Sequence, residues 1–593
     1  MSQLDTCAND PHHDLQQSSG PSISKETLGE FIKTLRGRFP VDRIYSIVGL
    51  NTGDEGKGRV VPDLTRVLTV ITGNAKNVGM VFKVNGGANS GHTVAGLKHN
   101  LIPGGITEKA VTTLGIGAGV VADPLKLDWE IRALRSKGFD STARLMIDPR
   151  AMVSDVSHRL LDLANEMYLT RVNGVGRGST GRGISPAFCD ETSQRQIYFS
   201  LFQDKDGFFE FEEQIKARCE LAERTIKDVY GLSVSEFDSL FEVLTSAEKR
   251  AHTYELDNGI VSRNEVDFSR YRGSAFGKLS WKAIADDYWR VGVQYADKIE
   301  DLGEHAMRSL RQGDPVLAEH GQAYWLDKRR GFPPNVTASH TTPAEIYHSL
   351  GIATDYKISV VGCCKAYDTK VGTHRFLSQI EDQHPLGEML KKIEFGTTTG
   401  RQRRVGWSDL VERGTAIRRI GSEHIALNKL DVLGYRDDWQ PGAMLKLCIG
   451  YKFVSDVVEP TRLLHLVPEQ DRRRSQCSPV YVELPSWTED ITHIRSFAEL
   501  PKAAQIYVAA TYAGMITCAS NNMHELSTIP HLSFLGVGPN PDEVILDAPN
   551  AHALFSLAAE ANIFTEQNLQ EFGRVHEYIK QRLDGSSGFK SEA

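Results

Sequence analysis

Short apolar runs alternate with glycine-rich or charged loops along most of the chain. Residues 44–49 lead into the glycine-rich loop 51–58, and residues 79–84 lead into a second such loop, 85–93. Apolar runs of this kind are typical of strands that are buried on both faces of a sheet. The pattern predicts an α/β fold, a large, mostly parallel central sheet flanked by helices, with ligands bound at the carboxyl ends of the strands.

The rest of the pattern predicts helices and further strands. Residues 60–68 have helical spacing, with Pro62 tolerated in the first turn. Residues 201–312 are expected to be mainly helical, because apolar positions from Tyr288 to Ala306 keep helical spacing on one face. The charge-free run 503–523 contains too many polar residues for a membrane span and predicts a buried helix. Further strands are expected at 316–318, 358–363, 424–427, 444–449 and 532–535.

We expect two main parts, a polar N-terminal extension (residues 1–40) and one α/β domain (residues 41–593). The domain carries a helical segment at about 201–312 and an insertion at about 460–479, so helical insertions and small antiparallel subdomains accompany the main sheet. Three successive arginines, Arg472 to Arg474, lie in the insertion. A charge run of this kind is usually a solvated face, and we expect the insertion to be exposed.

Composition excludes several classes of protein. The chain has 68 basic and 76 acidic residues, a net charge of -8, which argues against a protein that coats nucleic acid or anionic lipid. We therefore expect neither nucleic acid nor a membrane as a partner. The eight cysteines are scattered without paired metal-ligand spacing, and the first 20 residues have no apolar signal core. This pattern is typical of a reducing compartment, so a cytoplasmic location is expected.

The first glycine-rich loop has the features of a phosphate site. Its glycines let backbone N–H groups converge on phosphate oxygens, and Lys57 adds a positive charge. The loop does not match the Walker pattern, because Asn51 and Gly58 occupy the positions that need glycine and a hydroxyl. A solvated glycine-rich turn is the alternative. Since a carboxylate beside phosphates needs a cation or a proton, Asp54 is a candidate Mg²⁺ ligand, general base, or both.

The second glycine-rich loop contains a histidine, His92, close to the predicted end of a strand. A lone histidine is more often structural. Because Asp54 is predicted at a neighbouring strand end, we favour a role for His92 as an acid, or as a group that stabilises the oxygens of a transferring phosphoryl group.

The segment 428–431, Asn-Lys-Leu-Asp, follows a predicted strand and is a candidate for base recognition. Asp431 at this position can accept from guanine N1–H and the 2-amino group together, while the stem of Lys429 packs over the base. Charge-assisted bonds of this kind contribute about 1.5 to 3 kcal/mol. Beside a phosphate loop, the segment favours GTP over ATP.

The loop 396–404 concentrates hydroxyl and guanidinium groups. Arginine is preferred where a carboxylate or phosphate is held at two points, so this loop is a candidate clamp for a dicarboxylate near the transferring phosphate. A basic surface turn is the alternative, but three consecutive threonines between glycines disfavour it.

Seven motifs occur in the order and style of one known family. They are Gly53-Asp-Glu-Gly-Lys-Gly58, Asn89-Ser-Gly-His-Thr93, Leu101-Ile-Pro-Gly-Gly-Ile106, Gly178-Ser-Thr-Gly-Arg-Gly-Ile-Ser-Pro186, Thr398-Thr-Gly-Arg401, Lys429-Leu-Asp-Val432 and Leu484-Pro-Ser-Trp487. The chain resembles adenylosuccinate synthetase from about residue 44 to about 547. The resemblance implies a homodimeric ligase that joins IMP to L-aspartate with hydrolysis of GTP and Mg²⁺ as cofactor, through a 6-phosphoryl-IMP intermediate, in AMP biosynthesis and purine salvage.

The resemblance also implies a role for each matching residue. Asp54 is the base and His92 assists catalysis, with Lys57 at the phosphates; Asp54 and the Gly91 carbonyl contact the metal. The implied GTP contacts are Gly53, Glu55, Gly56, Gly58, Gly91, Thr93, Arg403, Lys429, Asp431, Gly536 and Gly538. The implied IMP contacts are Asp54, Lys57, Asn89, His92, Thr180, Arg195, Gln322, Thr337 and Arg401. The implied aspartate contacts are Thr398, Thr399, Arg401 and Arg403.

The chain departs from the family pattern in several places. Thr52 stands where the family usually has tryptophan, and Ala88 and Ser90 flank Asn89. The arginine that reaches the IMP site of the partner subunit falls at Gln194 by strict spacing, and we assign the role to its neighbour Arg195. A guanine-nucleotide switch or binding protein is the alternative function, but it leaves His92 and the loop 396–404 without a task. An inactive homologue is disfavoured, because the proposed base, acid and phosphate lysine are all present.

Overall fold

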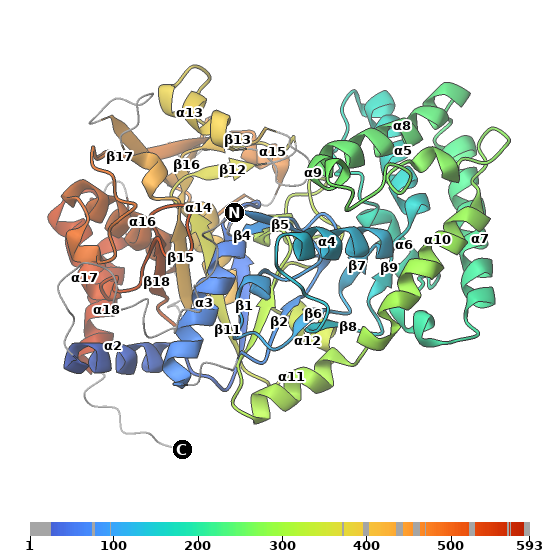
Figure 1. Ribbon diagram of the computed structural model, residues 1–593. Helices are drawn as coiled ribbons and strands as arrows, with labels where there is room; N and C mark the ends of the chain where they lie inside the picture. Colours follow the sequence, from blue (N-terminus) through green and yellow to red (C-terminus); the bar gives the residue numbers. More distant parts are fainter. Residues whose placement is uncertain are drawn as a thin grey trace.

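A nine-stranded sheet forms the centre of the computed structural model (Figure 1). The structure describes residues 25–585 except 74–77, 95, 371–372, 395–401, 435–442, 455–462, 469, 521–527, 566–568 and 570. The strands lie in the order β19 (Val544–Ile545), β18 (His531–Gly536), β15 (His424–Asn428), β11 (Ile358–Lys365), β1 (Ile44–Gly49), β10 (Val316–Glu319), β2 (Met80–Lys83), β6 (Leu114–Ile116) and β8 (Leu145–Ile147). All neighbours are parallel except β18 and β19. The predicted α/β fold is confirmed.

The strands expected from the apolar runs are present, and all but one belong to this sheet. The exception is the run 444–449, which lies in β16 (Met444–Phe453). This strand pairs antiparallel with β17 (Cys477–Pro485) and parallel with β14 (Ser408–Asp409) in a separate small sheet. An apolar run identifies a buried strand but not the sheet in which the strand pairs.

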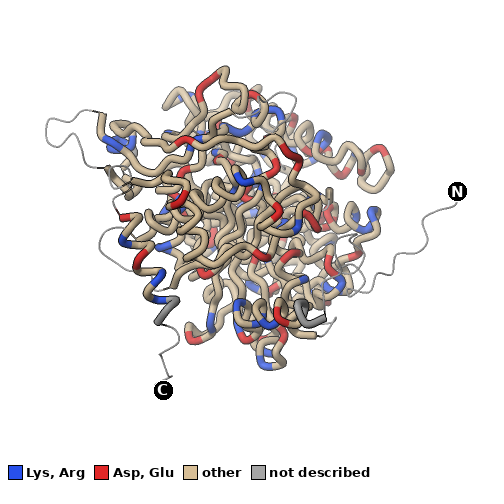
Figure 2. Tube along the Cα trace, turned by 90° about the vertical axis from the view of Figure 1, so that its left-hand side faces the viewer, with Lys and Arg blue, Asp and Glu red and all other residues tan. Residues whose placement is uncertain are grey.

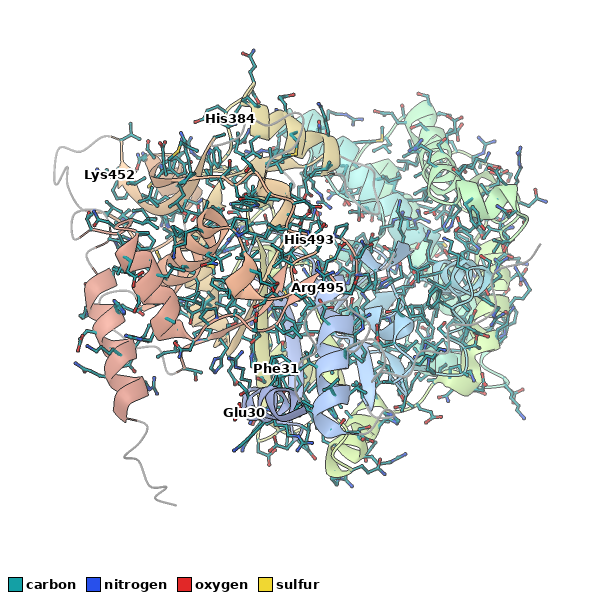
Figure 3. The ribbon with its side chains drawn as sticks, turned by 60° about the vertical axis from the view of Figure 1, so that its left-hand side comes forward. Glu30, Phe31, His384, Lys452, His493 and Arg495 are labelled. Carbon is teal, nitrogen blue, oxygen red and sulfur yellow. The ribbon has the colours of Figure 1, made fainter. Side chains whose placement is uncertain are left out.

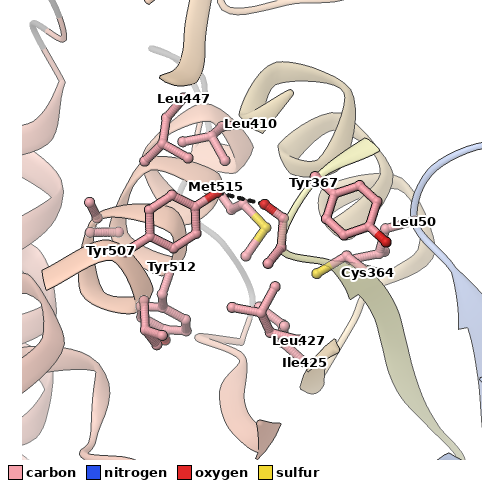
Figure 4. Close-up of a cluster of buried hydrophobic side chains, with 14 of the residues drawn as sticks. Leu50, Cys364, Tyr367, Leu410, Ile425, Leu427, Leu447, Tyr507, Tyr512 and Met515 are labelled. Atoms are coloured by element: carbon pink, nitrogen blue, oxygen red, sulfur yellow. Dashed lines mark hydrogen bonds between the residues drawn. The ribbon is translucent and has the colours of Figure 1, made fainter. Parts of the chain in front are cut away.

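Helices cover both faces of the central sheet. Helix α3 (Lys57–Thr72) directly follows β1 and its phosphate loop, with Pro62 inside it, and packs in the same apolar cluster as Tyr45 and Ile47. On the other side, α14 (Leu410–Ile420) packs against α16 (Lys502–Ser520). Helix α16 is the buried helix predicted from the charge-free run, and its Tyr507 donates to the Ala366 carbonyl at 2.5 Å inside the cluster shown in Figure 4. In the described part of the chain, no helix has both the length and the apolar character that a bilayer span needs.

The helical segment forms one end of the molecule. Figure 1 shows α7 (Phe208–Arg224), α8 (Val234–Ala251) and α10 (Trp281–Gly292) on the side away from α16. The apolar face from Tyr288 to Ala306 is divided, since a 3-10 turn at Val293–Lys298 separates α10 from α11 (Leu302–Arg311). Helix α10 packs on α7, whereas α11 covers the sheet. The expected helical content is therefore present, but only the second half of that face covers the sheet.

The N-terminal part of the described chain is a helix, α2 (Lys25–Arg38), labelled at Glu30 and Phe31 in Figure 3. Leu35 is buried, Phe31 packs against the core cluster of α3, and Arg36 Nε donates to the Ile71 carbonyl at 2.7 Å. The apolar positions around residue 31 thus dock on the domain.

The arginine run of the expected insertion is only partly exposed. Arg472 and Arg473 are exposed, but Arg474 is buried; its Nη2 lies 3.0 Å from Glu412 Oε1, and its guanidinium lies 3.6 Å from the centre of the Phe332 ring. The prediction that the three arginines form a solvated face is therefore wrong for Arg474. The physical reason is Glu412, a fully buried carboxylate that needs cationic partners and also binds Lys370.

The remaining elements are small sheets and peripheral helices. The strands are β3 (Gly86–Gly87), β4 (His92–Val94), β5 (Leu97–His99), β7 (Val120–Ala122), β9 (Met152–Val153), β12 (Asp368–Lys370) and β13 (Arg404–Gly406). The helices are α4 (Pro124–Ser136), α5 (Val156–Asn173), α6 (Ile184–Thr192), α9 (Thr253–Asp257), α12 (Glu345–Leu350), α13 (Pro385–Ile393), α15 (Asp471–Arg474), α17 (Ala551–Glu560) and α18 (Phe572–Gly585). Charged residues of both signs are distributed along the whole trace (Figure 2).

Candidate active site

The carboxyl ends of six parallel strands bring most of the predicted site residues to one edge of the sheet. Strands β1, β2 and β10 lead into the two glycine-rich loops and the segment 319–322, and β11, β15 and β18 lead into Lys365, residues 428–431 and residues 536–538. Because parallel strands end on the same side, residues far apart in the sequence meet there.

The phosphate loop is held in shape by an internal carboxylate. Glu55 is buried, accepts from Gly53 N–H at 2.6 Å and forms an ion pair with Lys57 Nζ at 2.8 Å. Asn428 Nδ2 donates to the Glu55 carbonyl at 2.8 Å, which fixes the loop to the end of β15. The carboxylate of Glu55 therefore organises the loop and balances the charge of Lys57.

Three predicted site residues have left-handed backbone conformations. Their φ angles are 62° at Asp54, 56° at Gln322 and 60° at Lys429, and each residue closely follows the end of a strand, β1, β10 or β15. For a residue with a Cβ this conformation costs roughly 1–2 kcal/mol. Such conformations cluster at functional sites, where the surrounding structure enforces them. At Asp54 the turn leaves the side chain 26% exposed and in an ion pair with Arg403.

His92 belongs to a buried network of charged groups. Its Nδ1 contacts Glu319 Oε1, and Lys83 Nζ lies 2.7 Å from the same carboxylate oxygen and 3.2 Å from His92 Nδ1. The Gly104 N–H donates to Glu319 Oε2 at 2.7 Å. Lys83 and Glu319 are register partners at the ends of β2 and β10. Only the histidine of this network reaches the surface, with 11% of its side chain exposed.

The network determines the protonation of its members. Burial and the neighbouring Lys83 lower the pKa of His92, so the neutral ring is favoured. Burial alone would raise the pKa of Glu319, but Lys83 and His92 hold this pKa well below its ordinary value. The result is an ionised carboxylate behind a largely neutral imidazole.

The histidine loop and the phosphate loop are in direct contact. A Cβ on Gly58, in the first turn of α3, would lie 2.9 Å from His92 Cβ, so only glycine lets the histidine approach the helix. Lys57 is also close enough to lower the pKa of His92. The structure thus brings together the two loops that the sequence placed at neighbouring strand ends.

Lys429, one of the two predicted base-recognition residues, lies beside a third buried carboxylate, Glu394. Its Oε1 is 2.5 Å from Lys429 Nζ, 3.3 Å from Lys365 Nζ and 2.5 Å from the Tyr367 hydroxyl. Burial opposes ionisation of Glu394, but Lys365 and Lys429 lower its pKa to about 2. Leu430 N–H donates to the Gly536 carbonyl at 3.0 Å, so the residues after β15 and β18 are joined.

Among the residues expected at IMP, Asn89 belongs to the second loop and Gln322 contacts it. Gln322 Nε2 donates to Ser90 Oγ at 3.1 Å, and Ile184, at the start of α6, reaches Gly87. Asn89 is half-buried in this loop, Thr180 is exposed just before α6, and the Thr337 N–H donates to the Leu326 carbonyl at 2.8 Å.

Two groups of predicted residues are not brought into this arrangement. Arg195 follows α6 with 52% of its side chain exposed and lies 3.3 Å from Asp190 Oδ1. Its neighbour Gln194 is also exposed. Thr398, Thr399 and Arg401 lie outside the described residues. Gly91 is half-buried and Thr93 is exposed, at the start of the β4 hairpin.

Sequence reasoning missed several residues of the site. They are Lys83, Glu319, Lys365 and Glu394; Asn428 was included only as the first residue of the candidate segment 428–431, and its bond to the phosphate loop was not predicted. Lys83, Glu319, Lys365 and Asn428 are the last residues of β2, β10, β11 and β15, and all are buried. A polar residue that closes an apolar run was the available signal, because a buried charge at a strand end needs a partner from another strand end.

These features define a class: α/β enzymes in which a phosphate loop and a histidine–carboxylate pair meet at the edge of a parallel sheet. The family model for adenylosuccinate synthetase matches residues 46–267 and 262–515. Adenylosuccinate synthetase from Syntrophus aciditrophicus is 32% identical over 470 residues, 78% of this chain and 91% of that protein. The enzyme from Caldicellulosiruptor bescii is 31% identical over 512 residues, 85% of this chain and 100% of that protein.

A solved structure shows the same fold. Fully ligated adenylosuccinate synthetase from Plasmodium falciparum superposes with a TM-score of 0.65 at 24% identity, covering 86% of this chain and 100% of that chain. The chain belongs to the adenylosuccinate synthetase family, and its enzyme class is that of the ligases.

Proposed function

We propose that the protein joins IMP and L-aspartate to adenylosuccinate with hydrolysis of GTP, the first step from IMP towards AMP. The observation that carries the proposal is the contact of His92 with Gly58, because it puts an imidazole, backed by Glu319, against the first turn after a phosphate loop. A switch protein needs the phosphate loop but has no use for this histidine.

In the first step Asp54 removes the N1 proton of IMP, and the electron pair moves into the ring so that O6 becomes an oxyanion. O6 then attacks the γ-phosphorus as the bond to the β-phosphate oxygen breaks and GDP leaves. In the second step the aspartate amine attacks C6, the 6-phosphate leaves with its electron pair, and the amine gives up a proton that the departing phosphate accepts. Phosphorylation is needed because a carbonyl oxygen is a very poor leaving group.

His92 would stabilise the charge on O6. When Nδ1–H donates to Glu319, the opposite nitrogen, Nε2, is available to the substrate. A proton on Nε2 gives an imidazolium that the carboxylate stabilises, while burial and Lys83 keep this imidazolium strongly acidic. The ring can thus donate to an oxygen that is gaining negative charge.

A magnesium ion fits the donor set at the phosphate loop. The Asp54 carboxylate and the Gly91 carbonyl are hard oxygen ligands, and Mg²⁺ commonly takes one or two protein oxygens with substrate phosphates and water completing its shell. The ion would neutralise charge on the phosphates. Asp54 is partly exposed and already faces a cation, Arg403, which supports its suitability as a ligand.

The other substrates would be held by the remaining strand-end residues. Asp431 would accept from guanine while the stem of Lys429 packs over the base, and Arg403, with Arg401, Thr398 and Thr399, would hold the aspartate carboxylates. We also propose a homodimer in which Arg195 reaches the IMP site of the other subunit. The half-exposed side chain of Arg195 supports this role, because it is available to a second copy.

The test mixes the protein with IMP, aspartate, GTP and Mg²⁺ and follows purine absorbance. Asp54→Asn is expected to lower kcat at least about 100-fold, the contribution of a positioned base. Asp355→Asn, a change of the same type at an exposed position, is expected to leave the rate unchanged. Turnover of GTP that does not depend on IMP and aspartate would contradict the proposal and support a nucleotide switch.

A further inference from the structure

Two arginines of α3 bind the loop that follows β18 through hydrogen bonds to its carbonyl groups. Arg59 donates from Nη1 to the Gly538 carbonyl and from Nη2 to the Glu543 carbonyl. Arg66, two turns further along the same helix, donates to the Pro541 carbonyl at 3.1 Å. Three carbonyl groups within one short loop thus accept from two guanidinium groups of one helix.

A buried carboxylate holds the two arginines together. Asp63 Oδ2 lies 3.4 Å from Arg59 Nε, and Asp63 Oδ1 lies 3.5 Å from Arg66 Nη1. The Asp63 side chain is 2% exposed. Burial raises the pKa of Asp63 to about 6, although both guanidinium groups oppose this shift, so the carboxylate is largely ionised at neutral pH. Arg66 is further fixed by Glu108 at 2.7 Å.

The loop itself, residues 536–543, is closed by its own hydrogen bonds. Val537 N–H donates to the Glu543 carbonyl at 2.9 Å, and Asn540 N–H donates to the Glu543 carboxylate at 2.6 Å. A loop that is bonded internally moves as one body, so anchoring it at Gly538, Pro541 and Glu543 fixes the orientation of the whole loop.

The close approach of Arg59 to the loop explains the glycine at position 536. A Cβ there would lie 3.1 Å from Arg59 Nη1 and 2.9 Å from Asn428 Oδ1, closer than side chains normally pack. The Gly536 carbonyl also accepts from Leu430, next to Lys429 and Asp431. The loop therefore joins the arginines of α3 to the segment proposed to read guanine.

We propose that Arg59 and Arg66, aligned by Asp63, are positioning residues for base selectivity. They hold the loop 536–543, and through it the segment 429–431, at a fixed distance from the phosphate loop, because α3 begins at Lys57. One helix thereby sets the spacing between the phosphate end and the base end of the nucleotide site. This inference rests on the proposed function, since it takes the base to be guanine.

The experiment compares Arg59→Ala and Arg66→Ala with Arg495→Ala in the full-length protein. Arg495, labelled in Figure 3, contacts the side chain of Asp542 in the same loop at 3.5 Å, but this ion pair is exposed and is expected to contribute little. For Arg59→Ala we expect a KM for GTP at least tenfold higher and a reduced preference for GTP over ATP, with the KM for IMP unchanged. Arg66→Ala should act in the same direction but less, and Arg495→Ala should match the wild type.

A second measurement needs no substrate. Without nucleotide, amide hydrogen exchange in residues 536–543 is expected to be faster in Arg59→Ala than in Arg495→Ala. Arg59→Lys retains one donor towards the carbonyl groups, so its exchange rate should lie between those of Arg59→Ala and the wild type. If Arg59→Ala exchanged at the rate of the wild type, Arg59 would not hold the loop 536–543 in place. Faster exchange with unchanged base preference would overturn its role in selectivity.

The two hypotheses fail in different ways. If the wild-type protein binds GDP no more tightly than ADP, the proposed reading of guanine fails before any variant is made. If the wild type prefers GDP and Arg59→Ala keeps the full preference, only the positioning role fails.

Discussion

Two buried carboxylates with similar surroundings serve different parts of the molecule. Glu319, at the edge of the sheet that carries the candidate active site, binds Lys83 at 2.7 Å and contacts His92. Glu248, in the helical segment, binds Lys126 at 2.5 Å and Arg159 at 2.6 Å and also contacts Arg182. Both carboxylates are fully buried, and their partners hold the pKa of each well below its ordinary value despite burial.

The difference lies in the partners. At Glu319 the imidazole partner, His92, reaches the surface beside the phosphate loop. At Glu248 the three cations are buried, and the imidazole of His252, 3.4 Å from the carboxylate and 13% exposed, lies edge-on to Trp129 of helix α4. A neutral imidazole beside a phosphate loop can exchange a proton with a substrate, but buried guanidinium groups can only hold their positions. A carboxylate among cations therefore marks a candidate active site only where its imidazole partner lies beside a loop suited to bind a ligand.

The Glu248 cluster is nevertheless tied to the site. Arg182 belongs to the loop 178–183, which contains Thr180, and Arg159 donates to the Gly181 carbonyl of the same loop at 3.2 Å. The helical segment thus anchors a loop that we propose to bind IMP.

The largest effect is expected for Glu248→Gln. Removing the charge leaves Lys126, Arg159 and Arg182 buried without a counter-charge, which typically costs about 3–5 kcal/mol. The free energy of unfolding, measured with urea, should fall by this amount. Glu242→Gln, an exposed change on the same helix, should leave it unchanged. A loss below about 1 kcal/mol in Glu248→Gln would show that the cluster does not stabilise the segment.

The matching substitution at the other carboxylate is Glu319→Gln. We expect kcat to fall about 100-fold, because His92 loses the group that orients its ring and stabilises its positive charge. Since the carboxylate raises the pKa of His92, its removal should also shift the limb of the pH–rate profile that reports His92 towards acid. The control is Glu130→Gln, which changes a buried carboxylate that accepts from the backbone of Leu101 and Ile102. It should leave the position of this limb of the pH–rate profile unchanged. An unshifted profile would mean that Glu319 is only structural.

The sequence predicted the fold from its apolar runs, because a parallel sheet buried on both faces leaves few polar positions in its strands. It also predicted which loops meet, since the ends of parallel strands share one edge. The loops that carry Lys57 and His92 do meet, whereas the roles of Asp54, His92 and Lys57 stay predictions. The charged network behind them was not predicted, because the pairing of Lys83 with Glu319 depends on the order of β2 and β10 in the sheet.

Other details depend on long-range packing that no local pattern contains. The burial of Arg474 requires Glu412, 62 residues away in sequence, and the pairing of Asp54 with Arg403 joins the loop after β1 to the residue before β13, a strand of a separate small sheet. The division of the apolar face at Val293–Lys298 was also missed, since a 3-10 turn preserves most of the spacing of an α-helix.

A smaller effect is expected in the pH dependence of stability, and it concerns Lys126 of the Glu248 cluster. Burial, opposed by Glu248, lowers the pKa of Lys126 to about 8, against an ordinary value of 10.5 in the unfolded chain. Between these values the unfolded chain binds more protons, so the folded protein gains stability as pH rises, by up to about 1.4 kcal/mol per pH unit. Lys126→Met lacks this proton, and its slope from pH 8 to 10 should be lower than that of the wild type by this amount. Lys249→Met, at an exposed position, should retain the slope of the wild type.

The smallest effect is expected for Arg182→Lys, which tests the link between the sealed cluster and the site. Lysine keeps the positive charge beside Glu248 but replaces the planar guanidinium, whose Nη1 contacts Glu248 from the loop 178–183, by an ammonium group of different shape. We expect a rise of about threefold to tenfold in the KM for IMP, corresponding to about 1 kcal/mol, with kcat and the KM for GTP unchanged. Arg177→Lys, directly before this loop and 4.0 Å from Glu166, should behave like the wild type. An equal rise in both KM values would mean that the Glu248 cluster supports the whole fold and not this loop in particular. Glu248 would then have no specific link to the proposed IMP site, unlike Glu319.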